Sequence, residues 1–108
     1  YIDNTVQINL LAATTDNDEA TDQVYNVALN DRTSLNKLYQ MIEERLIKRT
    51  QGLEKKEPIY QDFRAGDVRH SQANMDKAQT LLDYHPKYMI GKGMDEAMDW
   101  YVNSLGKL

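Results

Sequence analysis

Apolar residues recur at helical spacing in four stretches of the chain, and in two shorter stretches they alternate with their neighbours. The first helical stretch follows Asp3, which can cap a helix, and it ends at the polar run TTDNDEATD over residues 14–22. Its apolar positions are Val6, Leu10, Leu11 and Ala13. We therefore expect a helix followed by a surface loop over 14–22.

The second helical stretch begins after Thr33 or Ser34, either of which can accept a hydrogen bond from the first turn. Gly52 ends this helix or the frayed turn beyond it. One apolar stripe runs along it, formed by Leu35, Leu38, Tyr39, Ile42 and Leu46. The spacing predicts an amphipathic helix that buries this stripe.

Two further helices are expected near the end of the chain. Asn74 can cap the first, which stops at DYHP (83–86) because Pro86 disfavours a helical residue before it. Its inward positions are Met75, Ala78, Leu81 and Leu82. The last helix is expected to start after GKG (91–93), with Asp95 and Glu96 in its first turn. Its apolar face comprises Met94, Ala97, Met98, Tyr101 and Leu105.

The segments QVYNVAL (23–29) and EPIYQDF (57–63) have the composition of β-strands. Two strands joined through a helix should form a right-handed parallel unit. The predicted fold class is therefore α/β: a mainly helical fragment of about four helices around a two-stranded parallel unit, in the order helix, strand, helix, strand, helix, helix. Two strands alone make a poor sheet, so another copy or further chain should complete it.

The chain's 108 residues suit a single domain, 1–108. Because it starts at Tyr1 without an initiator methionine, we expect it to be a piece of a longer protein. A net charge of −4 with scattered basic residues argues against nucleic acid as a partner. Absent cysteines and short apolar runs argue against disulfides, thiolate metal sites and a membrane span, so a cytoplasmic location is expected. His70 and His85 lack carboxylates at metal-ligand spacing.

The stretch DFRAGDVRHS, directly after the second predicted strand, is the strongest candidate for chemistry. Arg64 could give a phosphate two charge-assisted hydrogen bonds, Gly66 would let the backbone approach a ligand, and Asp67 could accept from sugar hydroxyls. The turn around Asp31 would open on the same side of a parallel pair. A purely local interpretation stays open: Arg64 and Asp67 could pair across a tight turn, and Ser71 or Asn74 could be only a helix cap.

Four segments resemble a known family in the right order: YIDNTVQINLLAA, QVYNVALNDRTSLNKL, FRAGDVRHSQANMDKAQTLLDYHP and GMDEAMDWYV. They are similar to the C-terminal portion of the extended short-chain dehydrogenases/reductases, above all to bacterial UDP-N-acetylglucosamine 4-epimerases. Asp83 is a small departure, because the family commonly has glycine there. Asp can still adopt the left-handed cap at some cost.

The resemblance implies a cytoplasmic, homodimeric, NAD-dependent epimerase that serves polysaccharide synthesis, with this chain as its UDP-sugar-binding C-terminal domain. It implies that Arg64 contacts the UDP phosphates and Asp67 the uridine ribose, with Asp31 and Ser71 on the nucleotide side. The family's glycine-rich NAD turn and Tyr-x-x-x-Lys group are absent from these residues, so the NAD-binding Rossmann domain would lie outside them and this chain alone should not catalyse.

Two alternatives remain. A dehydratase or decarboxylase of the same family would have a similar C-terminal domain. The chain could instead be a non-catalytic module whose strand edges and methionine-rich last helix bind a partner protein.

Overall fold

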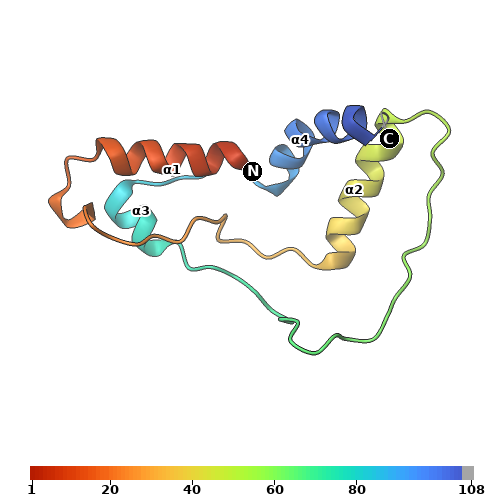
Figure 1. The fold of residues 1–108 in the computed structure, drawn as a ribbon, viewed down its shortest axis with the longest axis horizontal. Coiled ribbons are helices and arrows are strands. Elements are labelled where there is room, and N and C mark those ends of the chain that lie inside the picture. Colours follow the sequence, from red (N-terminus) through yellow and green to blue (C-terminus); the bar gives the residue numbers. More distant parts are fainter. Residues whose placement is uncertain (106–108) are drawn as a thin grey trace. The chain divides into compact units, whose positions relative to one another are not determined.

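The computed structural model describes residues 1–105, and within them the regular structure is entirely helical. The elements are α1 (Ile2–Thr14), the 3-10 helix η1 (Asp18–Ala20), α2 (Leu35–Arg49), α3 (Asp76–Leu82) and α4 (Ile90–Leu105), which can be followed in Figure 1. The chain forms two compact units. The first comprises Tyr1–Asp31 and Gln72–Gly93, and the second comprises Arg32–Ser71 and Met94–Leu108.

The predicted α/β fold class is wrong, because residues 1–105 contain no β-strand. Segments 23–29 and 57–63 were the predicted parallel strands, and neither takes part in a backbone-to-backbone hydrogen bond of the described residues. A strand exists only through such a ladder with a neighbour. The four predicted helices are present.

The first unit is organised around a small core under α1 and α3. Its buried residues are Ile8, Ala20, Met75, Ala78, Leu82 and Tyr84. The predicted inward face of α3 is confirmed by Met75, Ala78 and Leu82, while Leu81 packs at the edge of the core. Segment 14–22, predicted as a surface loop, contains the short helix η1. Its Ala20 is buried and contributes to the core, so this part of the segment does not lie at the surface.

Segment 23–29 is attached to this core by side chains. The Tyr25 hydroxyl donates to the Ala20 carbonyl at 2.7 Å, and the Ala28 N–H points at the Met75 sulfur at 3.0 Å. Tyr25 and Ala28 pack against the core, whereas Val24 is 87% exposed. The two residues that pack against the core, Tyr25 and Ala28, are three positions apart. In a β-strand the residues on one face are two positions apart, so this packing is not that of a strand.

Helix α1 buries only part of the face that its apolar pattern marks. Leu11 packs against the core, but Val6, Leu10 and Ala13 are exposed, and the fully buried residues are Asn4 and Ile8. Tyr1 occupies the cap position without a side-chain hydrogen bond, so the predicted cap by Asp3 is wrong and Asp3 lies inside the first turn.

Helix α3 begins one residue later than its sequence indicates: Met75 occupies the cap position without a side-chain hydrogen bond, so the predicted cap by Asn74 is wrong. The Asn74 side chain instead accepts from the Asp76 N–H at 2.7 Å, in a turn just before the helix. Asp83 ends the helix in the left-handed conformation, with φ of 52°. This confirms that aspartate takes the position that glycine most easily fills.

Helix α4 starts at Ile90, earlier than the predicted start after residues 91–93. The Gly93 N–H donates to the Met89 carbonyl at 2.9 Å, so the glycines belong to the first turns. A Cβ on Gly93 would lie 2.7 Å from the Tyr1 Cβ, which shows that this glycine allows close packing. Asp95 consequently lies beyond the first turn. Leu105 ends α4, and its side chain lies outside the described residues.

In the second unit, α2 and the later turns of α4 are joined by ion pairs. Arg45 contacts Asp95 at 2.7 Å and Arg49 contacts Asp99 at 2.6 Å. Ser34 caps α2 by accepting from the Lys37 N–H at 3.2 Å, which confirms one of the two predicted caps. The predicted buried stripe is wrong in part, because α2 has no fully buried residue and Leu35 is 82% exposed.

Candidate functional site

The candidate site lies in the second unit, on the irregular segment that follows α2. The segment makes a tight turn at Arg64–Asp67, where the Asp67 N–H donates to the Arg64 carbonyl at 3.2 Å. Gly66 has a φ of 90°, a conformation in which a side chain would be strained. The sequence DFRAGD therefore forms a turn that depends on its glycine.

Arg64 and Asp67 are brought together by this turn. The Arg64 Nε lies 3.6 Å from an Asp67 carboxylate oxygen, and the two side chains are 87% and 50% exposed. This is the contact expected from the local interpretation of the turn, and such an exposed pair contributes only ~0–1 kcal/mol to stability. The pair also leaves the guanidinium open to solvent, where a ligand could reach it.

Two more cations of the same unit lie on or against this segment. The Arg69 guanidinium carbon stacks over the Phe63 ring, 4.6 Å from its centre. The Arg32 Nη1 lies 3.4 Å from the His70 Nδ1. The contact brings Arg32, from the start of the second unit, against the segment that carries Arg64.

The contact between Arg32 and His70 was not foreseen from the sequence. Thirty-eight residues separate the two positions, so no local spacing signals the pair. The available hint was composition, because Arg32 directly follows Asp31 in the turn that was expected to border the site.

The two remaining predicted residues are both exposed but belong to different units. Ser71 is the last residue of its segment of the second unit, and Asp31 ends the first segment of the first unit. The predicted contact of Arg64, Asp67, Asp31 and Ser71 with UDP stays a prediction.

The glycines of the described residues are not arranged as in a dinucleotide turn. A dinucleotide turn needs clustered glycines between a strand and a helix. Gly52 and Gly66 are single turn residues, while Gly91 and Gly93 lie inside α4. Residues 1–105 also contain no group of three or more histidine, aspartate or glutamate side chains that could hold a metal ion.

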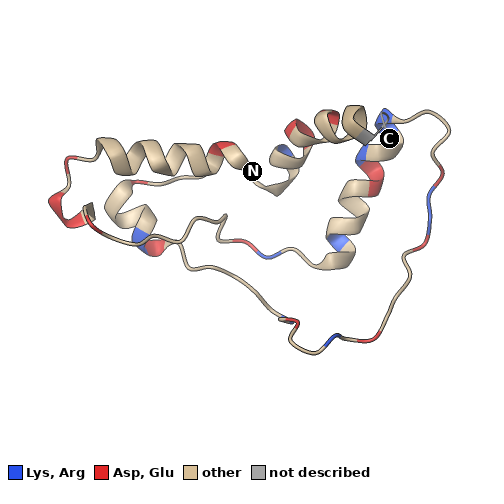
Figure 2. Ribbon diagram, viewed as in Figure 1, with Lys and Arg blue, Asp and Glu red and all other residues tan. Residues whose placement is uncertain are grey.

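Basic side chains are spread over several elements of the chain. Figure 2 shows Lys and Arg on α2, α3, α4 and the connecting segments rather than along one element. None of the helices in residues 1–105 combines the length and apolarity that a membrane crossing requires.

The chain shows a similarity of modest extent to a curated protein. The chain is 31% identical over 80 residues to Protein CapI of Staphylococcus aureus, an alignment that covers 74% of this chain and 22% of CapI. The chain thus spans about a fifth of the length of this relative. No protein-family model matches the chain.

These findings correct the family identification made from sequence segments. Residues 1–105 lack the strands that a C-terminal piece of an extended short-chain dehydrogenase/reductase was expected to contribute, and no family model supports the assignment. One of the segments that carried the resemblance, QVYNVALNDRTSLNKL, includes residues 23–29, which form no strand in the structure.

Proposed function

We propose that this chain is the nucleotide-sugar-binding part of a longer cytoplasmic protein that acts in polysaccharide synthesis. The observation that carries the proposal is the Gly66 turn, which presents an exposed Arg64 guanidinium beside the Asp67 carboxylate. Arginine suits a diphosphate because its planar fork gives two charge-assisted hydrogen bonds, and a carboxylate suits the hydroxyls of a ribose. The similarity to Protein CapI supports the link with polysaccharides.

In this proposal Arg64 binds the diphosphate of UDP, Asp67 accepts from the ribose, and Asp31 and Ser71 contribute further nucleotide contacts. The reaction that we propose for the whole protein is the interconversion of UDP-N-acetylglucosamine and its 4-epimer. NAD would be held by residues outside this chain, in a homodimer. A dehydratase or decarboxylase acting on a UDP-sugar is the alternative reaction.

An amide NMR titration of the chain with UDP, and separately with UDP-N-acetylglucosamine, tests the binding step. We expect chemical-shift changes near Asp31 and from Arg64 to Ser71. Arg64→Ala should weaken binding about ten- to a hundredfold, because a hydrogen bond to a charged group contributes roughly 1.5–3 kcal/mol. Lys48→Ala, which removes an exposed cation of α2, should leave the affinity unchanged.

A second variant separates the turn from its charge. Gly66→Ala keeps Arg64 but strains the turn at φ of 90°, so it should also weaken UDP binding. Equal affinities of the unaltered chain, Arg64→Ala and Gly66→Ala for UDP would refute the assignment.

A protein-interaction module is the second candidate function, and one feature of the second unit favours it. An apolar groove of about 380 Å³ lies on α2 and α4, lined by Ile42, Leu46, Met94, Ala97, Met98 and Tyr101. Sedimentation over a range of concentrations would show whether the groove joins two copies. Ile42→Asp should then shift the chain toward the monomer, and an unaltered chain that is monomeric throughout would count against self-association.

A further inference from the structure

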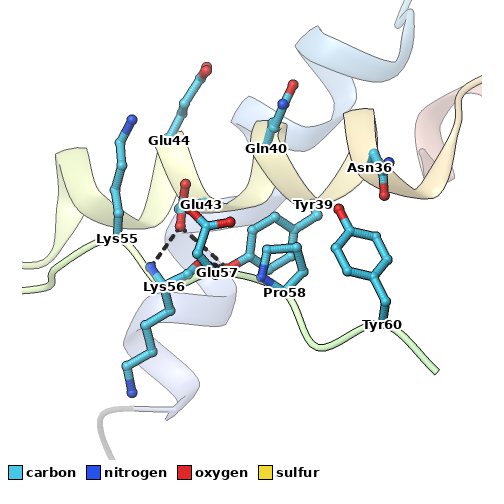
Figure 3. Close-up of a pocket in the computed structure, with 10 residues that line it drawn as sticks. All are labelled: Asn36, Tyr39, Gln40, Glu43, Glu44, Lys55, Lys56, Glu57, Pro58 and Tyr60. Atoms are coloured by element: carbon cyan, nitrogen blue, oxygen red, sulfur yellow. Dashed lines mark hydrogen bonds between the residues drawn. The ribbon is translucent and has the colours of Figure 1, made fainter.

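A polar pocket of about 400 Å³ lies between α2 and the extended segment 55–60, apart from the Arg64 turn. Figure 3 shows the helix on one side and the segment on the other, with the Tyr39 and Tyr60 rings between them. The lining residues are Asn36, Tyr39, Gln40, Glu43, Glu44, Lys55, Lys56, Glu57, Pro58 and Tyr60. All of them belong to the second unit.

One end of the pocket is held in place by hydrogen bonds between its two sides. The Tyr39 hydroxyl donates to the backbone carbonyl of Lys56 and lies 3.3 Å from the Glu43 Oε1. The Lys56 N–H donates to the same Glu43 oxygen at 3.0 Å. These bonds attach the extended segment to the helix, so a ligand would find this end already formed. Since both contacts of Glu43 use Oε1, its Oε2 is left as an acceptor for a ligand.

The other end carries a large aromatic surface in solvent. Tyr60 is 74% exposed, and Figure 3 shows its ring on the segment opposite Asn36 of α2. A tyrosine ring offers an apolar face together with a hydroxyl at its tip, which suits a ligand that has both apolar and polar sides. The lining of the pocket also contains amide and carboxylate groups, which together donate and accept hydrogen bonds.

The lining excludes several ligand classes. Three carboxylates, of Glu43, Glu44 and Glu57, oppose an anion, and Figure 3 shows the side chains of Lys55 and Lys56 extending away from the two tyrosine rings. A purely apolar ligand would leave these carboxylates and amides without hydrogen bonds. A metal ion lacks a suitable ligand group within residues 1–105.

We propose that this pocket binds a neutral sugar ring. The C–H face of a pyranose would stack on Tyr60, and its hydroxyls would bond to the Asn36 amide and the Glu43 Oε2. The volume matches the lower range of small-molecule pockets, which suits one monosaccharide rather than a long chain. The inference does not rest on the proposed UDP site, because the two share no residue.

The test is saturation-transfer NMR of the chain with N-acetylglucosamine and with methyl β-glucopyranoside, followed by amide titration. We expect saturation transfer to the sugar ring protons and amide shifts at Asn36, Glu43 and Tyr60. Tyr60→Ala should weaken binding about three- to tenfold, as expected for loss of one aromatic stacking contact. Tyr60→Phe keeps the ring face and should retain most of the affinity.

Matched controls make the outcome decisive. Tyr101→Ala removes another exposed tyrosine of the same unit and should leave sugar binding unchanged. Circular dichroism of each variant checks the fold, which should survive because Tyr60 is mostly exposed. The proposal is overturned if neither sugar binds, if Tyr60→Ala binds as well as the unaltered chain, or if choline binds more tightly than both sugars, since that would assign the pocket to an organic cation.

Discussion

The Asn4 side chain makes two hydrogen bonds with the backbone of Tyr88, eighty-four residues later in the chain. Its Nδ2 donates to the Tyr88 carbonyl at 2.7 Å, and its Oδ1 accepts from the Tyr88 N–H at 3.1 Å. Asn4 is only 3% exposed. One amide therefore satisfies both backbone groups of the residue that precedes α4 by two positions, and fixes α1 to the segment between α3 and α4.

We expect Asn4→Ala to destabilise the chain by about 1–3 kcal/mol, because it leaves backbone groups of Tyr88 without partners away from water. Asn4→Asp should destabilise the chain at least as much. The carboxylate could still accept from the Tyr88 N–H, but it has no proton to donate to the Tyr88 carbonyl. The measurement is the free energy of unfolding in urea.

Asn9→Ala is the matched control for this prediction. The Asn9 amide donates only to the Thr5 carbonyl of its own helix at 2.8 Å, and the residue is exposed. Its replacement should change the free energy of unfolding by less than about 0.5 kcal/mol. Equal losses for the two alanine variants would contradict the role given to Asn4.

The helices were predictable because their signals are local. Ser34 and Asp83 mark helix ends through contacts within a few residues, and the buried positions of α3 repeat at helical spacing. Part of the buried face of α1 was missed because its first buried residue is the polar Asn4, whose partner is distant in sequence. No periodicity of apolar residues can reveal such a position.

The strand predictions failed because β-propensity describes how a side chain fits a pleated, half-buried surface. Ile59 is 89% exposed and Tyr60 74%, so segment 57–63 has the composition of a strand, but these side chains lie largely in solvent and not on a half-buried pleated surface. At the candidate site, the pairing of Arg64 with Asp67 follows from their spacing in a turn. The contact of Arg32 with His70 depends on the course of the chain between them.

Tyr84 provides a test of a buried hydroxyl. The residue is completely buried, and its hydroxyl has no hydrogen-bond partner among the described residues. Tyr84→Phe should therefore leave the free energy of unfolding unchanged or raise it, because it removes an unsatisfied polar group. Tyr84→Ala should lower it by about 3–5 kcal/mol through the cavity that it leaves. A large loss in the phenylalanine variant would mean that the hydroxyl has a partner, such as a buried water.

The ion pair between Arg45 and Asp95 should contribute modestly to stability. Two guanidinium nitrogens of Arg45 reach the two carboxylate oxygens at 2.7 and 3.3 Å, but Asp95 is 54% exposed. A double-mutant cycle with alanine at both positions should give a coupling of about 0.5–1 kcal/mol, which falls as salt is added. The cycle of Lys48 with Asp95 is the control, and it should give a coupling near zero.

The Tyr39 hydroxyl should make stability depend on pH in the alkaline range. Partial burial, followed by the nearby Glu43 carboxylate, raises the pKa of Tyr39 above its ordinary value of 10.0. A group whose folded pKa is raised stabilises the fold fully below its unfolded pKa, and this contribution is lost as the pH rises through the folded pKa. Ionisation would also remove the proton that Tyr39 donates to the Lys56 carbonyl.

Unfolding free energies measured from about pH 9 to pH 12 should therefore decline more steeply for the unaltered chain than for Tyr39→Phe. Burial also raises the pKa of Tyr84, so some decline should persist in the variant. The difference between the two curves isolates Tyr39, and it should be absent below about pH 9, where both tyrosines are neutral. Parallel curves across the whole range would show that the hydroxyl of Tyr39 makes no proton-dependent contribution, and that segment 55–60 is held to α2 by other contacts.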